Sequence, residues 1–373
     1  MNDLTASELS AELNTELIAK LNAELQTLLA GISGLDFKSM EEIQTRLDSL
    51  TKPQGSLGRL ESLAKQLGGI QGTARPKIQK KAVLLMCGDH GVAAEGVSAF
   101  PQEVTPQMIQ NILQGGAAIN VLARQAGAEV FCTDVGVAFP VEGNIIRRRV
   151  ADGTRNMARF PAMTPEQALQ ALLAGAEVAR EKIESGYNLL ATGDLGIGNT
   201  TPSSAIIALL TDSTLEQVVG RGTGLDDTGL KNKILVIEKA IAFNQPDPED
   251  PLDVLTKVGG LEIAAIAGAI LQAAASCTAV VIDGLISTAG ALIAAKLAPQ
   301  CRDFMIPSHD SAEIGHVKAL AALNLDPMLH LNMRLGEGTG AVLTFFLVEA
   351  ALRILEEMAT FADAGVSEKK ESR

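Results

Sequence analysis

Tryptophan is absent from this 373-residue sequence, and aromatic residues make up only 3% of it. Hydrophobic residues still amount to 47%. The core must therefore consist of alanine, leucine, isoleucine and valine, which suits helices packed on a parallel sheet. Positive charge is also in deficit, with a net charge of −13 at pH 7. This balance disfavours nucleic acid and an anionic membrane surface as partners, but it excludes no enzyme class.

Cysteine is scarce, and its spacing fits neither a disulfide framework nor a metal site. The amino terminus, MNDLTASELS, lacks the basic and apolar regions of a signal peptide. Residues 263–282 carry no charge, but alanine dominates them, so we expect a buried helix and strand and not a membrane span. We therefore predict a soluble, cytoplasmic protein with reduced thiols at Cys87, Cys132, Cys277 and Cys301.

Residues 1–70 show a helical pattern, with leucines at steps of three or four residues from Leu9 to Leu28. Thr5 with Glu8, and Ser39 with Glu42, have the spacing of capping boxes. The segment from Thr339 to about Phe361 predicts a long amphipathic helix near the other end. Since neither end contains a predicted strand, we expect both ends to form one small helical domain.

Short apolar runs begin at residue 82, and a helical pattern follows nearly every one. Continuous apolar strands that alternate with helices predict an α/β fold: a mainly parallel, six-stranded sheet with helices on both faces. Polar or glycine-rich segments follow these strands, at the sheet edge where open α/β sheets bind ligands. The six runs are AVLLMC, EVFCT, NLLAT, TAVVI, DFMI and LHLNM.

The segment GDLGIGNTT, residues 193–201, joins a predicted strand to a helix. Free N–H groups at a helix start bind anions, and Gly196 and Gly198 would let a ligand approach them. The spacing is not G-x-G-x-x-G, and no acidic residue follows at the end of a predicted strand about twenty residues later, so a dinucleotide fingerprint is poorly supported. A phosphate site and a simple tight turn remain open.

A second glycine-rich segment, GRGTGLDD, spans residues 220–227, and Lys233 follows closely. Glycines followed by lysine indicate a phosphate held by backbone donors and one point charge. Asp226 and Asp227 have carboxylates suited to Mg²⁺, but no apolar strand precedes them, so helix capping is the better interpretation. A plain surface loop is the remaining alternative.

Residues 88–108 combine polar Asp89 and His90 with apolar Phe100 and Met108. Such a loop is typical of a pocket wall for a flat aromatic ligand. The segment PSHDSAE places Ser308 and Ser311 where they can cap a helix or bind phosphate. The four histidines show no i, i+4 pair and no G-x-S-x-G elbow is present, so we predict neither a metal site nor a serine nucleophile.

The octet RLGEGTGA, residues 334–341, places Glu337 between two glycines just before an apolar helix. A carboxylate at a helix start stabilises it by about 0.3–1 kcal/mol. Alternatively, Glu337 is a general base: the glycines admit a substrate, and apolar neighbours raise the carboxyl pKa toward neutrality. The octet alone leaves both roles open.

Eight motifs occur in order between about residue 45 and residue 360: TKPQGSLGRLE, DHGV, EGVSAFPQEVT, GIGNTT, GRGTGLDD, DGLIST, PSHDSAE and RLGEGTGA. In these motifs the chain resembles the nicotinate-nucleotide:dimethylbenzimidazole phosphoribosyltransferases, the CobT family of cobamide assembly. The resemblance implies a homodimer. It also implies a Rossmann-like catalytic domain at residues 76–338, with a small helical domain formed by residues 1–75 and by a C-terminal helix and frayed tail at 339–373.

The resemblance also implies the reaction. Nicotinate mononucleotide would donate its phosphoribosyl group to 5,6-dimethylbenzimidazole or a related base, without cofactor or metal, giving α-ribazole 5′-phosphate and nicotinate for the cobalamin nucleotide loop. Glu337 would be the general base. The mononucleotide would contact Asp194, Gly196, Gly198, Gly222, Lys233 and Ser311, and the aromatic acceptor would contact Phe100, Met108 and Leu335.

Two departures from the family pattern keep alternatives open. Asp194 stands where the family's GEMGIGNT form has glutamate, and Phe100 and Met108 stand where some members have serine and glutamine. With fewer polar groups near the ring, the site would select benzimidazoles less strictly or admit a phenol such as p-cresol, with the chain acting as one subunit of a heteromer of similar chains. A non-catalytic subunit of such a pair, and a dinucleotide oxidoreductase, are the other hypotheses.

Overall fold

A computed structural model describes residues 6–367, and for residues 6–14 only the backbone. Its sheet has six strands in the order β3-β2-β1-β4-β5-β6, and every pair is parallel. The predicted α/β fold with a six-stranded parallel sheet is confirmed. The strands are β1 (Lys81–Gly88), β2 (Ala128–Gly136), β3 (Ile146–Arg147), β4 (Leu189–Leu195), β5 (Ala279–Ile282) and β6 (Met305–Pro307).

One of the six predicted strands is wrong. The run LHLNM, residues 329–333, forms only an isolated bridge between Leu329 and His309, and the backbone turns to a positive φ of 54° at Asn332. The sixth strand is instead β3, which pairs with β2 at the sheet edge through two residues. A strand this short has no apolar periodicity that a sequence pattern could reveal.

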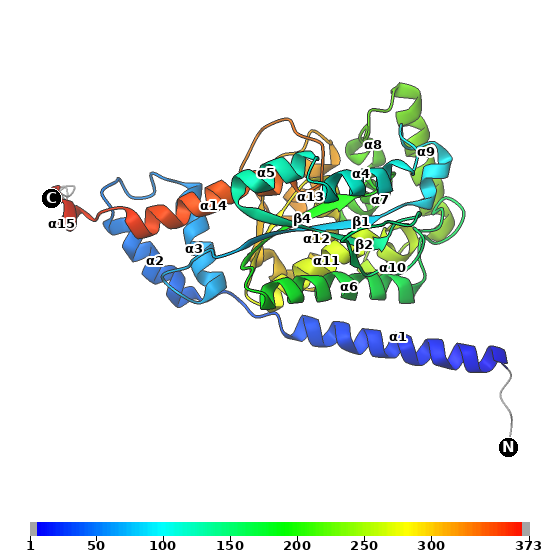
Figure 1. Ribbon diagram of the computed structural model, residues 1–373, viewed down its shortest axis with the longest axis horizontal. Helices are drawn as coiled ribbons and strands as arrows, with labels where there is room; N and C mark the ends of the chain where they lie inside the picture. Colours follow the sequence, from blue (N-terminus) through cyan, green and yellow to red (C-terminus); the bar gives the residue numbers. More distant parts are fainter. Residues whose placement is uncertain (1–5, 368–373) are drawn as a thin grey trace, which may run out of the picture.

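Helices cover both faces of the sheet (Figure 1). The helices α6 (Pro165–Glu184) and α11 (Leu261–Ala275) lie on one face, and α5 (Ala118–Ala126) and α14 (Thr339–Glu357) lie on the other. Gly175 lets α6 approach α11 closely, since a methyl group there would lie 1.9 Å from the Ala265 carbonyl oxygen. The charge-free residues 263–282 are confirmed as buried helix and strand. No helix of the described residues is long and apolar enough to cross a membrane.

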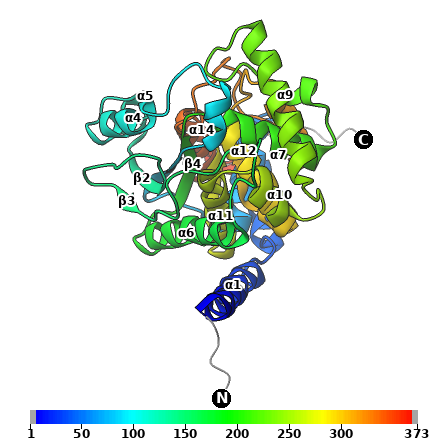
Figure 2. The same ribbon diagram turned by 90° about the vertical axis from the view of Figure 1, so that its right-hand side faces the viewer.

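The remaining helices lie mostly beside the carboxyl edge of the sheet, and α7, α9 and α10 pack together near α12 (Figure 2). Asp226 caps α9 by accepting a 2.7 Å hydrogen bond from the Gly229 N–H, so the predicted capping role is confirmed. These helices are α4 (Val104–Leu113), α7 (Thr200–Thr211), α8 (Leu215–Val218), α9 (Asp227–Asn244), α10 (Pro251–Val258), α12 (Leu285–Leu297) and α13 (Gly315–Leu323), with short 3-10 turns at Gly91–Glu95 and Pro299–Phe304.

Segments from the two halves of the chain meet in a helical cluster formed by α2 (Phe37–Ser49), α3 (Arg59–Gln71), the end of α14, and α15 (Phe361–Ala364). Arg46 donates a 2.9 Å hydrogen bond to the Met358 carbonyl, and Leu50 forms an isolated bridge with Thr360. The predicted cap at Ser39 is wrong, because Asp36 caps α2 and Ser39 lies inside the helix. The predicted cap at Thr5 lies outside the described residues.

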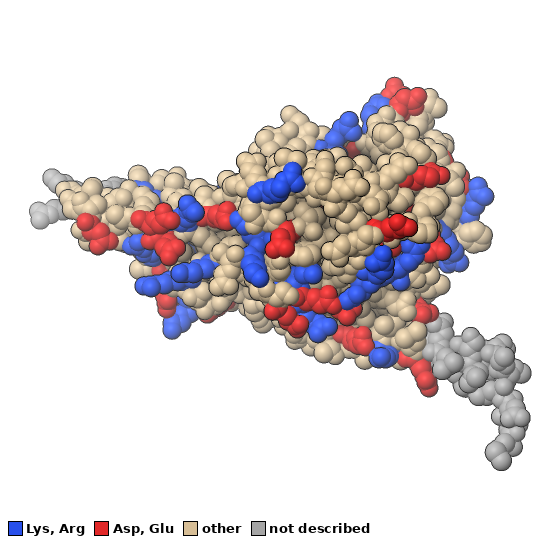
Figure 3. All heavy atoms as spheres, in the orientation of Figure 1, with Lys and Arg blue, Asp and Glu red and all other residues tan. Residues whose placement is uncertain are grey.

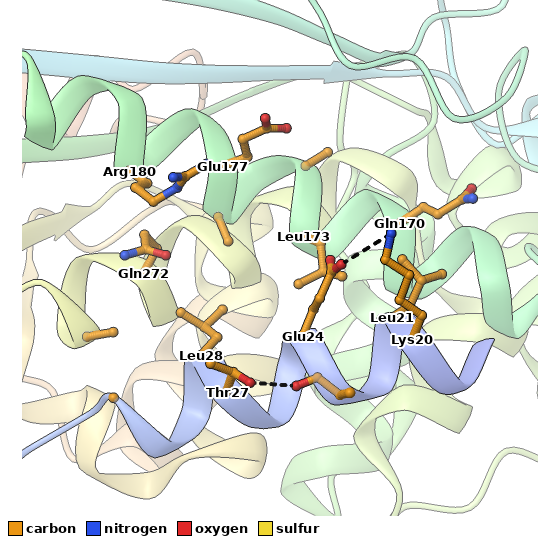
Figure 4. A pocket seen from close by; sticks show the side chains of 15 residues that line it. Lys20, Leu21, Glu24, Thr27, Leu28, Gln170, Leu173, Glu177, Arg180 and Gln272 are labelled. Atoms are coloured by element: carbon orange, nitrogen blue, oxygen red, sulfur yellow. Dashed lines mark hydrogen bonds and ion pairs between the residues drawn. The ribbon is translucent and has the colours of Figure 1, made fainter. Parts of the chain in front are cut away.

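The first helix, α1 (Ala6–Ala30), lies along α6 and α11. Leu21 and Leu28 point from α1 toward α6, and a groove of about 870 Å³ remains between the helices (Figure 4). The described part of the leucine stripe, from Leu17 to Leu28, therefore packs on the α/β body. We propose the division into domains at residues 75 and 338, with α1 packed against α6 and α11 of the α/β body. Residues 368–373 of the predicted tail lie outside the described part.

Acidic and basic side chains alternate on the face shown in Figure 3. Arg148, for example, pairs with Glu177 at 3.0 Å and with Glu181 at 2.6 Å. Exposed pairs of this kind contribute little to stability. They do divide the positive charge into small areas on this face, so a polyanion would find no continuous basic surface here.

Candidate active site

A cavity of about 430 Å³ lies at the carboxyl ends of the central strands. Parallel strands present their following loops at this edge, which is where open α/β sheets bind ligands. Segments that follow β1, β4, β5 and β6 all reach it, together with the glycine-rich loop at Gly222 and the octet at Glu337. The lining residues are Phe100, Val104, Met108, Asp194, Leu195, Gly196, Ile197, Asn199, Thr200, Gly222, Thr223, Gly284, Leu285, Ile286, His309, Ser311, Glu313, Arg334, Leu335, Gly336 and Glu337.

The octet has a strained backbone. Gly336, Glu337 and Gly338 have successive φ values of 86°, 61° and 87°, and a left-handed conformation costs a residue such as glutamate about 1–3 kcal/mol. The segment also lies directly on the sheet, because a methyl group on Gly338 would lie 2.8 Å from Val83 Cγ1. Glycine is therefore required beside Glu337 both for conformation and for close approach, which explains the unusual sequence.

Asp283, the residue after β5, holds the octet in this position. Its carboxylate accepts hydrogen bonds from the backbone N–H groups of Gly338, at 3.1 Å, and Ala341, at 3.0 Å. N–H groups at the start of α14 have no carbonyl partner within the helix, so Asp283 caps α14 from the end of β5. The sequence analysis did not identify this residue, although it follows an apolar run at the ligand-binding edge.

The Glu337 side chain is buried, at 5% exposure, and its Oε2 has no hydrogen-bond partner. Burial is the main cause that raises its pKa; the backbone N–H of Ile119 lowers it, and the neighbouring Asp283 charge raises it. The net direction is upward from 4.5. A carboxyl group with a raised pKa and an unpaired oxygen at a cavity wall suits proton transfer.

Asp194 lies beneath the same segment. Its Oδ2 accepts a 3.1 Å hydrogen bond from the Asn199 side chain, and a methyl group on Gly336 would lie 3.0 Å from this oxygen. Burial, followed by the charges of Asp283 and Glu262, raises the Asp194 pKa well above its ordinary value.

Anion-binding groups line another part of the cavity. The first residues of α7 (Thr200) and α12 (Leu285, Ile286) line it, and the first N–H groups of a helix attract negative charge. Lys233 is buried behind this wall; its ammonium donates hydrogen bonds to Thr200 Oγ1, at 2.7 Å, and to the Gly220 carbonyl, at 3.3 Å. Burial lowers the pKa of Lys233 to about 8.

The apolar wall comes from α4, the loop before it and the octet. Met108 is half-buried, and Phe100 and Leu335 are 52% and 56% exposed at the cavity wall. Thr105 fixes this helix: its hydroxyl donates to Asp89 Oδ1 at 2.6 Å and accepts from the Ile197 N–H at 3.1 Å. Through Thr105, α4 is thereby hydrogen-bonded to the loop that follows β4.

Most of the predicted site residues thus line one cavity. Gly198 and Lys233 do not line it. Gly198 has a φ of 93° and packs against His90 and Ala93 within the turn, and Lys233 acts from behind Thr200 and Gly222. Val104, Asn199 and His309 line the cavity but were not predicted. The described residues contain no group of three or more histidine, cysteine or acidic side chains placed to hold a metal ion.

Comparisons with known proteins agree with this geometry. A family model described as "Phosphoribosyltransferase" matches residues 32–366. The nicotinate-nucleotide–dimethylbenzimidazole phosphoribosyltransferase of Chloroflexus aggregans is 54% identical over 91% of this chain and 97% of its own. The enzyme of the same name from Desulforudis audaxviator is 55% identical over 93% and 99%. The crystal structure of CobT from Thermus thermophilus superposes with a TM-score of 0.85 at 48% identity, covering 89% of this chain and all of that one.

Proposed function

We propose that this chain, which belongs to the nicotinate-nucleotide–dimethylbenzimidazole phosphoribosyltransferase family, transfers the phosphoribosyl group of nicotinate mononucleotide to 5,6-dimethylbenzimidazole or a related aromatic base. The products are α-ribazole 5′-phosphate and nicotinate, for the nucleotide loop of a cobamide. The observation that carries the proposal is the Glu337 carboxylate, which belongs to a cavity with helix starts on one side and an apolar wall on another.

The bond changes require only one proton acceptor. The bond from C1′ to the nicotinate nitrogen breaks, and its electron pair stays on that nitrogen, so the pyridinium ring becomes neutral without help from an acid. A benzimidazole nitrogen bonds to C1′ from the opposite side, which inverts the β linkage to α. The other benzimidazole nitrogen then loses its proton to Glu337. General-base catalysis of this kind contributes about 10²–10⁴-fold, and alignment of the two substrates in one cavity adds to it.

The binding roles follow from the two sides of the cavity. The mononucleotide phosphate lies near the starts of α7 and α12, with Gly196, Gly222 and Ser311 close to it, and Lys233 supplies a positive charge through Thr200. Gly198 shapes the turn, and Asp194 supports the octet. The aromatic acceptor lies against the apolar wall. This wall consists of Phe100, Met108 and Leu335, with Val104 added.

The test is acceptor-dependent release of nicotinate. Purified chain is incubated with nicotinate mononucleotide and 5,6-dimethylbenzimidazole, and nicotinate and the ribotide are separated by chromatography. Equimolar appearance of the two products supports the proposal. Absence of nicotinate release with every benzimidazole and phenol tried would end it. Mononucleotide without acceptor is the control for plain hydrolysis.

A phenol or p-cresol acceptor is a second candidate, favoured by the apolar side chains of Phe100 and Met108 at the wall. A phenol hydroxyl would lose its proton to the same Glu337. The acceptor screen distinguishes the two classes by the ratio of kcat/KM for p-cresol and for 5,6-dimethylbenzimidazole. The variants Phe100→Ser and Met108→Gln should shift this ratio toward the benzimidazole, since they restore polar groups beside the ring.

We also propose a cytoplasmic homodimer. Phe100, Leu335 and Leu331 are apolar and about half exposed on segments at or near the cavity, so a second copy would cover a surface that is costly to leave in water. Light scattering on the purified chain measures the mass directly. A monomer that gains activity only with a similar chain would instead support a heterodimer or a supporting, non-catalytic subunit.

A further inference from the structure

His309 is a cavity residue to which no role has been given so far. Its side chain is 2% exposed, yet the residue lines the cavity. The ring packs against the first turn of α14, because a methyl group on Gly340 would lie 2.0 Å from Nδ1. Nδ1 also lies 2.9 Å from Ser308 Oγ. The third glycine of the octet therefore makes room for this imidazole, whose orientation is fixed.

The other ring nitrogen of His309 has no hydrogen-bond partner among the described residues. A methyl group on Gly284 would lie 3.9 Å from this Nε2 and 4.0 Å from Ser311 Cβ. Gly284 is the N-cap residue of α12. Nε2, Ser311 and the free N–H groups of α12 are thus neighbours on one part of the cavity wall, and all three are suited to an anion.

The nearby His316 shows the opposite arrangement. Its Nδ1 accepts a 2.9 Å hydrogen bond from the Ser311 N–H, and its Nε2 lies 2.9 Å from Thr288 Oγ1. The Thr288 hydroxyl donates to the Gly284 carbonyl, so His316 Nε2 carries the hydrogen toward it. Burial lowers the His316 pKa to about 3. His316 is therefore a neutral structural residue that joins Ser311 to α12, with no nitrogen left for a ligand.

We propose that His309 is a substrate-binding residue whose Nε2–H donates a hydrogen bond to the phosphate of the mononucleotide at the start of α12. Nδ1 lies within hydrogen-bond distance of the Ser308 hydroxyl and 4.0 Å from Asp283 Oδ1. In the tautomer in which Nδ1 accepts from Ser308, the ring hydrogen is on Nε2, as this role requires. The inference rests on the proposed function and deepens it. It adds the His309 imidazole as a hydrogen-bond donor to a phosphate site in which the positive charge of Lys233 lies close to the negative charge of Glu313.

The test uses two amide variants that differ in donor position. In His309→Gln the amide nitrogen reaches the place of Nε2, whereas in His309→Asn it reaches only that of Nδ1. With nicotinate mononucleotide, the asparagine variant should lose at least about tenfold in kcat/KM, mostly through KM, and the glutamine variant should lose much less. With nicotinate riboside, which has no phosphate, both variants should match the unmodified chain.

Equal losses on the mononucleotide and the riboside, or an asparagine variant as active as the glutamine variant, would overturn the inference. Melting temperatures show whether each variant folds. Should His309→Asn not fold, Ser308→Ala replaces it, since it removes the donor to Nδ1 and should weaken mononucleotide binding specifically. Calorimetry with nicotinate mononucleotide measures the contact without turnover. A chain that binds the mononucleotide but never releases nicotinate would therefore refute the transferase and leave the phosphate contact measurable.

Discussion

The Asp283 carboxylate accepts a 3.1 Å hydrogen bond from the backbone N–H of Gly338, the residue that follows the proposed base. Its negative charge also raises the Glu337 pKa. Asp283→Asn keeps the shape of the side chain and removes that charge. We expect the acidic limb of the kcat–pH profile to move to lower pH, together with a loss of about 0.5–2 kcal/mol of stability from the weakened cap.

Asp363→Asn is the matched control for this variant. Asp363 is an exposed carboxylate that interacts with Thr360 at the start of α15, remote from the cavity. It should alter stability slightly and leave the pH profile unchanged. An Asp283→Asn enzyme with an unmoved acidic limb would show that Asp283 does not influence the base.

Replacement of the base itself should separate binding from chemistry. Glu337→Gln keeps the size of the side chain but cannot accept the acceptor proton. We expect kcat with 5,6-dimethylbenzimidazole to fall by at least about 10²-fold, while the affinity for nicotinate mononucleotide, measured by calorimetry, stays nearly constant. Turnover close to that of the unmodified chain would contradict the assignment.

The same variant should be more stable at neutral pH. The Glu337 pKa is raised in the folded chain above 4.5, so the folded state binds this proton more tightly than the unfolded state does. The contribution of the group to stability is full below about 4.5 and is lost as pH rises through the folded pKa. Glu337→Gln should therefore melt at a higher temperature near pH 8, with a difference that shrinks toward pH 4. A constant difference would place the cause elsewhere.

Binding of the mononucleotide should weaken at alkaline pH. The pKa of Lys233 is lowered to about 8 by burial, so the ammonium loses its proton as pH rises through that value. We expect KM for the mononucleotide to increase above about pH 8 and to become nearly independent of pH in Lys233→Met. The riboside donor is the control, because its KM should not follow this titration. The same pH dependence in Lys233→Met would assign the change to another group.

Close contact and backbone conformation can be separated at Gly338. Gly338→Ala would place Cβ 2.8 Å from Val83 Cγ1 at a φ of 87°. Gly55→Ala has a similar φ of 73° but meets nothing within 4 Å. Both variants should lose about 1 kcal/mol from the left-handed conformation, and only Gly338→Ala should lose more stability and most of its activity. Chemical denaturation and kcat measure the two effects.

The sheet was largely predictable from sequence because its central strands are continuous apolar runs. The prediction failed at two short segments. Ile146–Arg147 forms a two-residue strand, whereas LHLNM forms a loop with one isolated bridge. Hydrogen bonds to distant parts of the chain decide between these two outcomes, and they leave no pattern in the sequence. Within the site, Glu337 was recognisable from its glycine neighbours. Asp283 and His309 were not, because their importance comes from segments about 30 to 55 residues away, Gly338 and Gly340, which only the folded chain brings to them.

The helix α14 begins beside Glu337 and continues without interruption to Glu357, where α2 and α3 hold its far end. A continuous helix transmits displacement along its axis, so its two ends cannot shift independently. A partner that binds outside the cavity and tilts the cluster of α2, α3 and the end of α14 would thus also move Glu337.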